Sequence, residues 1–161
     1  MWEEAASQLP PLEWPIDPDD YDLIKKIGQG AFATVWRAQT KSEKDEDGRE
    51  CAIKVLNLDH VDSNLSEIRS EVQLMRLSSH QNVLTCHAAF VNDINLWLIT
   101  PLMRKGSSLH CLQTARREII NRQKSLGKQI QLPSMEEHIF YIMHETLLGL
   151  QYIHTNGQIH R

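Results

Sequence analysis

The sequence has few cysteines and no pattern that pairs them. Its 161 residues include three cysteines, namely Cys51, Cys86 and Cys111, which are dispersed and form no Cys-x-x-Cys motif. This usage is typical of reduced thiols in a cytosolic protein, and it argues against a disulfide framework. We therefore expect core thiols and a cytoplasmic location.

Long apolar runs are also missing. No stretch approaches the ~20 consecutive apolar residues that span a membrane. The N-terminal residues 1–4 lack the basic and apolar regions of a secretory signal. We therefore expect no membrane insertion. The hydrophobic share of 41% and the charged share of 24% are those of a globular chain that can bury a core.

Histidines are common, but metal-ligand spacing is absent. The chain contains eight histidines. None forms an i, i+4 helical pair or stands at ligand spacing from a cysteine, which structural zinc sites require. The sequence therefore predicts no metal site in this chain.

The charges are unevenly distributed. Residues 3–22 hold seven acids and no base, whereas residues 104–128 hold seven bases and one acid, Glu118. A basic segment could meet nucleic acid, acidic lipid or an acidic peptide, or it could be a solvated helix and loop. No aromatic residue lies among these bases, although single-strand binding relies on aromatic stacking. We favour the solvated surface and predict no nucleic-acid partner.

A glycine turn, Gly28-Gln29-Gly30, lies between two β-prone segments, 21–27 and 33–39. Glycine lets a backbone bend sharply and approach a ligand closely. Lys54 lies on the next expected strand, 50–56, which is otherwise mostly apolar. Backbone N–H groups and one ammonium suit a polyphosphate, although glycine pairs also occur in ordinary hairpins and a lysine can snorkel.

A helix is predicted from a capping box at Asn64 and Glu67 to about Leu77. Its apolar stripe consists of Leu65, Ile68, Val72 and Met75. Glu71 lies about 80° from the centre of that stripe at ~100° per residue, so we expect it to face Lys54 along the helix–sheet interface. The alternative is a solvent-facing acid.

The other expected elements complete a sheet and begin a helical region. Strands over 83–91 and 95–99 would flank a turn at Asn92-Asp93 and complete a five-stranded antiparallel sheet. We expect Trp14-Pro15-Ile16 to dock on the outside of this sheet. Helices are expected over 109–122 and from a cap at Ser134, with Glu137 in its capping box, to Asn156-Gly157. The expected inner face of the last helix is Ile139, Ile142, Met143, Thr146, Leu147, Leu150 and Ile153.

These features together resemble the eukaryotic protein kinases. The resemblance rests on Gly28-x-Gly30 with Val35, on Ala52-Ile53-Lys54, on Glu71, on the 100–103 connector and on Ile159-His160-Arg161. Trp14-Pro15-Ile16 and the segment 149–161 resemble sterile-20-like kinases of the germinal-centre group, closest to the oxidative-stress-responsive and proline/alanine-rich kinases. The implied fold is α+β: residues 1–13 a leader, 14–103 an N-lobe with its hinge, and 104–161 the first helices of an incomplete C-lobe.

The resemblance also implies residue roles. It implies an ATP site formed by Ile27, Gly28, Gln29, Gly30, Ala31, Phe32, Ala33, Thr34, Val35, Ala52, Lys54, Thr100, Leu102 and Met103. Ile27, Val35 and Ala52 would enclose the adenine, and the glycine turn would cover the phosphates. Lys54 would hold the α- and β-phosphates and form an ion pair with Glu71. Thr100 would be the gatekeeper, and His160 and Arg161 would begin the catalytic loop.

The resemblance implies a serine/threonine kinase that uses ATP and magnesium on protein substrates in stress or osmotic signalling, with an upstream activating kinase as a further partner. Ala33 replaces the third glycine of the family pattern. The catalytic aspartate and the metal ligands would follow Arg161, so we expect the 161 residues alone to be inactive. The alternative is a pseudokinase or allosteric adaptor that binds partners without catalysis.

Overall fold

The computed structural model describes residues 13–41, 48–60, 65–127 and 135–159. The chain forms two compact units, Met1–Leu77 with Thr85–Leu102, and Ser78–Leu84 with Met103–Arg161. The expected caps Asn64 and Ser134, the side chain of Glu67, residues 1–12 of the leader, and His160 and Arg161 lie outside the described residues.

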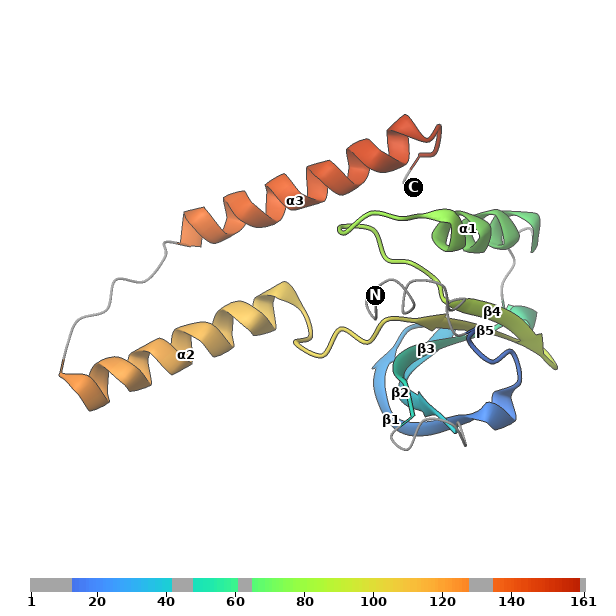
Figure 1. The fold of residues 1–161 in the computed structure, drawn as a ribbon, viewed down its shortest axis with the longest axis horizontal. Coiled ribbons are helices and arrows are strands. Elements are labelled where there is room, and N and C mark those ends of the chain that lie inside the picture. The colour runs from blue at the N-terminus through green and yellow to red at the C-terminus, as the bar shows by residue number, and fades with distance from the viewer. Residues whose placement is uncertain (1–12, 42–47, 61–64, 128–134, 160–161) are drawn as a thin grey trace, which may run out of the picture. The chain divides into compact units, whose positions relative to one another are not determined.

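The first unit contains a five-stranded antiparallel sheet with the strand order β1-β2-β3-β5-β4 (Figure 1). Its strands are β1 (Tyr21–Gln29), β2 (Ala33–Thr40), β3 (Glu50–Asn57), β4 (Ala88–Asn92) and β5 (Asn95–Thr100). Asp93 adopts a φ of 52° in the turn between β4 and β5, which aspartate tolerates better than most residues. The five strands and the helices that follow confirm the predicted α+β fold.

One face of the sheet, which we call the outer face, carries an apolar cluster. Tyr21, Ala38, Cys51, Ile53 and Ile99 are buried there together. Ala38 lies opposite Cys51, and Ile53 lies opposite Ile99. Because cross-strand partners project to the same side of an antiparallel sheet, this register brings them into one layer.

Aromatic rings extend the outer face. Phe90 stacks on Trp97 with ring centroids 5.7 Å apart and on Tyr21 at 6.4 Å. Trp14 packs against the same cluster, which confirms the expected docking of this segment outside the sheet. Ile16 does not take part, because 71% of it is exposed.

The opposite face, which we call the helix face, is covered in part by α1 (Leu65–Leu77). Ile68, Val72 and Met75 of α1 pack against a cluster that includes buried Leu96 and Leu98 of β5. These three positions confirm the predicted stripe, whereas the side chain of Leu65 lies outside the described residues. The helix face therefore has a core of its own where α1 covers it.

The expected strand over 83–91 is too long, because β4 begins only at Ala88. The reason is a tight turn in the preceding segment. The Val83 N–H donates to the His80 carbonyl oxygen at 3.1 Å, and the Asn82 N–H donates to Nδ1 of His80 at 3.1 Å. Residues 78–84 belong to the second unit.

The second unit contains α2 (Ser108–Leu126) and α3 (Met135–Thr155). Ser107 caps α2, since its Oγ accepts a hydrogen bond from the His110 N–H at 3.2 Å. Gly127 ends α2 with a φ of 61°, a left-handed conformation that favours glycine. The predicted helix over 109–122 is therefore correct in type, but it is four residues too short at its end. The helix continues to Leu126 because no helix-breaking residue occurs before Gly127.

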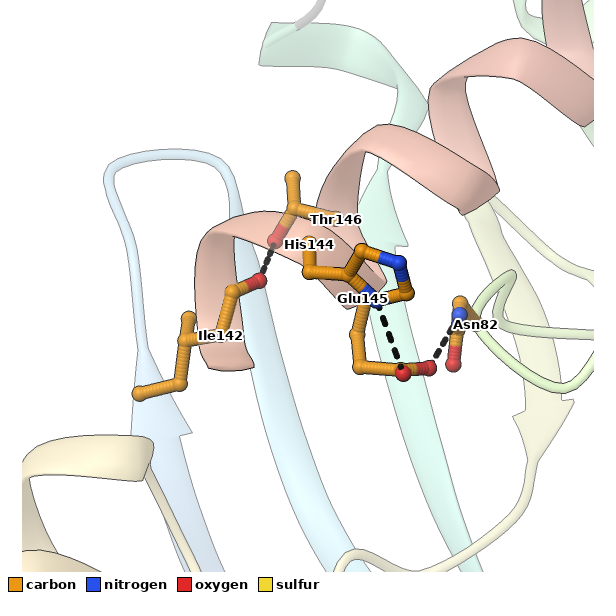
Figure 2. A network of polar contacts seen from close by, with 5 residues as sticks. All are labelled: Asn82, Ile142, His144, Glu145 and Thr146. Carbon is orange, nitrogen blue, oxygen red and sulfur yellow. Dashed lines mark hydrogen bonds and ion pairs between the residues drawn. The ribbon is translucent and has the colours of Figure 1, made fainter. Parts of the chain in front are cut away.

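Segment 78–84 packs against one side of α3. Nδ2 of Asn82 donates to Oε2 of Glu145 at 2.7 Å, as Figure 2 shows. The Ser79 N–H donates to the Tyr152 hydroxyl at 3.0 Å. A Cβ on Gly149 would lie 2.8 Å from the Asn82 carbonyl oxygen, so only glycine allows this approach.

The predicted inner face of α3 is therefore partly wrong. Ile139, Met143 and Leu147 are exposed, as is Thr146, whose hydroxyl donates to the Ile142 carbonyl oxygen at 2.7 Å. Within the described part of the chain, polar contacts of segment 78–84 select the side of α3 that carries Glu145, Gly149 and Tyr152. Apolar periodicity cannot reveal such polar contacts, since it counts only hydrophobic positions.

Candidate nucleotide-binding site

The glycine turn joins β1 to β2. Gly28 lies opposite Val35 in the β1–β2 ladder, and the Gly30 N–H donates to the Ala33 carbonyl oxygen at 2.8 Å. Neither glycine has a positive φ. A Cβ would lie 3.5 Å from Val35 at Gly28 and 3.8 Å from the Ala33 oxygen at Gly30, which is ordinary contact. The fold itself therefore does not require glycine at either position.

The tip of this turn exposes apolar side chains. Phe32 is 59% exposed and Ile27 is 49% exposed. The Asn57 N–H donates to the Phe32 carbonyl oxygen at 3.2 Å, which ties the tip to the end of β3. The β1–β2 register shifts between Lys26 and Gly28, so Ile27 lies at an irregularity of the kind often found beside binding sites.

Strand register gathers the expected site residues on the helix face. Lys54 lies opposite Val35 on one side and Leu98 on the other, and Ala52 lies opposite Thr100. Ala52 and Lys54 are two residues apart on β3, so they project to the same face. Val35, Ala52, Lys54 and Thr100 therefore share one surface, next to the glycine turn. Leu98 belongs to the same row and was missed, although its position in the strand alternation was a usable signal.

Lys54 is exposed, and so is Glu71 on α1. α1 packs on the face that carries Lys54, as expected. However, no ion pair at 4.0 Å or less joins Lys54 to Glu71 among the described residues. Their pairing therefore stays a prediction. A hydrated ammonium beside a glycine turn is nevertheless free to meet an anionic ligand.

Thr100 ends β5 and is buried, with 8% exposed. Its hydroxyl donates to the Ala52 carbonyl oxygen at 3.3 Å. This bond links two expected site residues on neighbouring strands and holds the threonine hydroxyl against β3. The small side chain of Ala52, also 8% exposed, lies opposite Thr100 in the β3–β5 ladder.

The expected connector divides between the two units. Pro101 and Leu102 close the first unit, and Met103 opens the second. Met103 is 62% exposed, and its carbonyl oxygen accepts a hydrogen bond from the Gly106 N–H at 3.0 Å. His160 and Arg161 lie outside the described residues, so their role in a catalytic loop stays a prediction.

Two of the three cysteines, Cys51 and Cys86, are buried. Burial raises the pKa of Cys51 to about 11 and also raises the pKa of Cys86, so both are thiols rather than nucleophilic thiolates at neutral pH. The part of the chain that the structure describes has no group of three or more His, Cys, Asp or Glu side chains that could hold a metal ion. It also has no helix long and apolar enough to cross a membrane.

Sequence reasoning missed the ion pair at the edge of this surface. Arg37 of β2 donates to Glu50 of β3 through Nε at 2.8 Å and through a second guanidinium nitrogen. Arg37 lies on the same face as Val35, two residues further along β2. The pair was not predictable from spacing alone, because it depends on the register between β2 and β3, in which Arg37 lies opposite Ala52.

Comparison with known proteins identifies the class. The family model described as protein tyrosine and serine/threonine kinase matches residues 21–161. This match covers most of the chain, and the chain belongs to the protein kinase family. The antiparallel sheet, its packed helix and the helices that follow are consistent with the N-lobe and the start of the C-lobe of such a kinase.

Three relatives show which kind of protein kinase the chain resembles. The chain is 35% identical over 159 residues to germinal center kinase 3 of Caenorhabditis elegans. This alignment covers 97% of the present chain and 25% of that protein. It is 31% identical over 154 residues to serine/threonine-protein kinase fray2 of Dictyostelium discoideum, covering 94% of this chain and 13% of that protein. It is 28% identical over 148 residues to serine/threonine-protein kinase sid1 of Schizosaccharomyces pombe, covering 92% and 27%.

These relatives confirm the resemblance to germinal-centre-type serine/threonine kinases. The chain spans only about a quarter or less of the length of each of the three.

Proposed function

We propose that this chain forms the nucleotide-binding part of a protein serine/threonine kinase, which transfers the γ-phosphoryl group of ATP to protein hydroxyls. One observation carries the proposal. The register places Lys54, Val35, Ala52 and Thr100 on one face, beside two glycines that the fold does not require. Glycines that the fold does not need suit a ligand that approaches the backbone closely, because no Cβ stands in its way.

The residues on the helix face have separate tasks in this proposal. Ile27 and Val35 cover the adenine, and Ala52 forms its floor. Thr100 limits the depth of the adenine site, since its hydroxyl is held by the Ala52 carbonyl oxygen. Leu102 and Met103 offer backbone groups to the adenine edge. The apolar area of Ile27 and Phe32, exposed in this structure, would be covered by the nucleotide.

The phosphates would lie under the turn from Gly28 to Thr34. Backbone N–H groups there and the Lys54 ammonium would neutralise and orient the α- and β-phosphates. Glu71 would hold Lys54 in that position by an ion pair. Magnesium would supply further charge neutralisation when bound.

ATP titration of the purified chain tests the proposal. Replacement of Lys54 by methionine keeps an unbranched side chain, one atom shorter, and removes its charge. We expect it to weaken ATP binding at least about tenfold, since a charge-assisted contact contributes roughly 1.5–3 kcal/mol. Lys26→Met is the matched control. Lys26 lies opposite Trp36, which lies opposite Ile53 of the outer face. Equal loss in both variants would refute the assignment.

Gly28→Ala and Gly30→Ala test the glycine turn separately from the fold. A Cβ fits at both positions, so we expect the free energy of unfolding to change by less than about 1 kcal/mol. ATP binding should nevertheless fall, because the methyl groups obstruct the approach of the phosphates. A loss of stability without a loss of binding would show that the glycines serve the hairpin.

A binding protein of the same fold that performs no catalysis is the second candidate. The missing Lys54–Glu71 ion pair among the described residues favours it. Glu71→Gln discriminates the two: a kinase that forms the pair with nucleotide bound should lose ATP affinity or phosphoryl transfer, whereas an adaptor should be unaffected.

The finer assignments rest on the family resemblance of the sequence and are proposals of the same kind. We propose a role in stress or osmotic signalling, protein substrates, activation by an upstream kinase, and a cytoplasmic location. We also propose that residues 14–103 act as the N-lobe with its hinge and that residues 104–161 begin the C-lobe.

A further inference from the structure

A short segment that precedes the sheet is held at each of its residues. This segment, Glu13–Pro15, is called the Trp14 strap. Its Glu13 carbonyl oxygen accepts a hydrogen bond from Nη2 of Arg49 at 2.9 Å, and its Pro15 carbonyl oxygen accepts one from the Tyr21 hydroxyl at 2.7 Å. Between them, the Trp14 side chain packs against the apolar cluster of the outer face.

Two nitrogen-bearing side chains contact the Trp14 indole. The His87 ring stacks on it with centroids 4.5 Å apart and planes inclined by only 5°. The Arg49 guanidinium carbon lies 4.3 Å from the centroid of the indole, which is cation–π geometry. Arg49 precedes β3 and His87 precedes β4, so the indole joins three segments that are distant in sequence.

His87 cannot easily withdraw from this contact. Its backbone N–H donates to the Ile99 carbonyl oxygen at 2.8 Å, which fixes the residue to the end of β5. Protonation of the His87 ring would therefore place a second positive charge beside the Arg49 guanidinium, and both cations would lie against the Trp14 indole. Burial and the nearby Arg49 charge both lower the pKa of His87, which means that this site favours the neutral ring.

Two other titratable groups of the cluster carry no charge in mild acid. Burial raises the pKa of Tyr21 and the pKa of Cys51, so both are neutral in mild acid. The carboxylates of Asp20 and Glu50 act on Tyr21 and Cys51, whereas the pKa of His87 responds to burial and to Arg49. Glu13 meets Arg49 through its backbone carbonyl. Arg49 remains the charged group that acts on His87.

We propose that the Trp14 strap is a pH-sensitive clamp, in which protonation of His87 releases Trp14 from the outer face of the sheet. A histidine whose pKa is lowered by docking favours the docked state above its ordinary pKa, about 6.5. This preference is lost as the pH falls below that value. Between the ordinary and the lowered pKa, the ratio of docked to released strap falls about tenfold per pH unit. The clamp shares no residue with the nucleotide site.

Fluorine NMR of the chain labelled with 5-fluorotryptophan tests the clamp. The sequence holds four tryptophans, and Trp14→Phe assigns the resonance of Trp14. We expect this resonance to move from a docked to a solvent-exposed position between pH 7.5 and 5. In His87→Phe, which keeps a stacking ring without a titrating nitrogen, it should stay docked throughout. In His87→Lys it should be released even at pH 7.5.

His154→Gln is the matched control, because His154 is an exposed histidine on α3, and the titration should persist in it. A Trp14 resonance that is exposed at pH 7.5, that stays docked at pH 5, or that titrates equally in His87→Phe would overturn the proposal. The wild-type titration decides the matter even if a variant fails to fold.

Discussion

The two faces of the sheet differ in what covers them. The outer face is closed by the chain's own residues: Trp14 packs on the cluster that contains Cys51 and Ile53, and an aromatic row from Tyr21 to Trp97 continues the cover. The helix face is covered by α1 only in part, and Lys54 on it remains exposed. The outer face of these strands therefore stabilises the fold, whereas the helix face combines a core under α1 with an exposed part at Lys54 that is open for a ligand.

The alternation along β3 shows how one strand serves both purposes. Cys51 and Ile53 are fully buried on the outer face. Ala52 and Lys54, one residue further along in each case, face the other way. A change at Cys51 or Ile53 should therefore affect stability, and a change at Ala52 or Lys54 should affect binding. Substitutions on each face can test this separation.

The largest effect is expected from Ile53→Ala. Ile53 is completely buried in the outer cluster, so its truncation should lower the free energy of unfolding by about 2–5 kcal/mol. Urea unfolding followed by far-ultraviolet circular dichroism measures this. Ile27→Ala on β1 is the control: Ile27 is 49% exposed, and its loss should cost much less stability while it weakens ATP binding.

Trp14→Ala should have the next largest effect. It removes the stack on His87, the contact with Arg49 and part of the cover of the outer cluster. We expect a loss of about 2 kcal/mol, because the side chain is only partly buried. Cys51 should also react faster with a thiol reagent. Ile16→Ala, a change at a neighbouring residue that is 71% exposed, should alter neither property.

Alkaline pH should weaken the outer face through Cys51. Burial raises the pKa of this thiol from 9.0 to about 11, so folding favours the neutral form. The stability that it provides is complete below the unfolded-state pKa and falls as the pH rises from about 9 towards 11, by up to about 1.4 kcal/mol per pH unit. Thermal unfolding between pH 8 and 11 measures this decline.

Cys51→Ala should make that decline less steep, because only Cys86 and Tyr21, whose pKa values burial also raises, then contribute to it. A decline that is equally steep in the variant and the wild type would contradict the role of Cys51.

Thr100→Val should have the smallest effect. It keeps the shape of the side chain and removes the hydrogen bond to the Ala52 carbonyl oxygen, so we expect a loss of about 1 kcal/mol. Thr34→Val, on β2 and without a described side-chain hydrogen bond, should be close to neutral. Equal losses in the two variants would show that the bond does not contribute.

Much of the first unit could be predicted from the sequence. Glycine and Asp-rich turns separate β-prone runs, so the strands and their two faces follow from an alternation of period two. The row of Val35, Lys54 and Leu98 was not fully predictable, because cross-strand register depends on loop geometry that no local pattern encodes.

Polar contacts limited the prediction of the second unit. The Asn82–Glu145 bond and the close approach of Gly149 to Asn82 choose the buried side of α3, although its hydrophobic pattern favours Met143 and Leu147. Similarly, the contacts of Arg49 and His87 with Trp14 depend on three separate segments. Such contacts depend on tertiary structure, so the sequence indicated only that Trp14 would dock.

The most direct test of the difference between the faces is a map of backbone amide shifts on addition of ATP. In ¹⁵N-labelled chain, we expect the largest shifts at Gly28, Gly30, Val35, Ala52 and Lys54, with the outer-face amides of Ala38, Cys51 and Ile99 changing little. A response confined to the outer face, or no response at millimolar ATP, would contradict the assignment of the helix face as the nucleotide-binding surface.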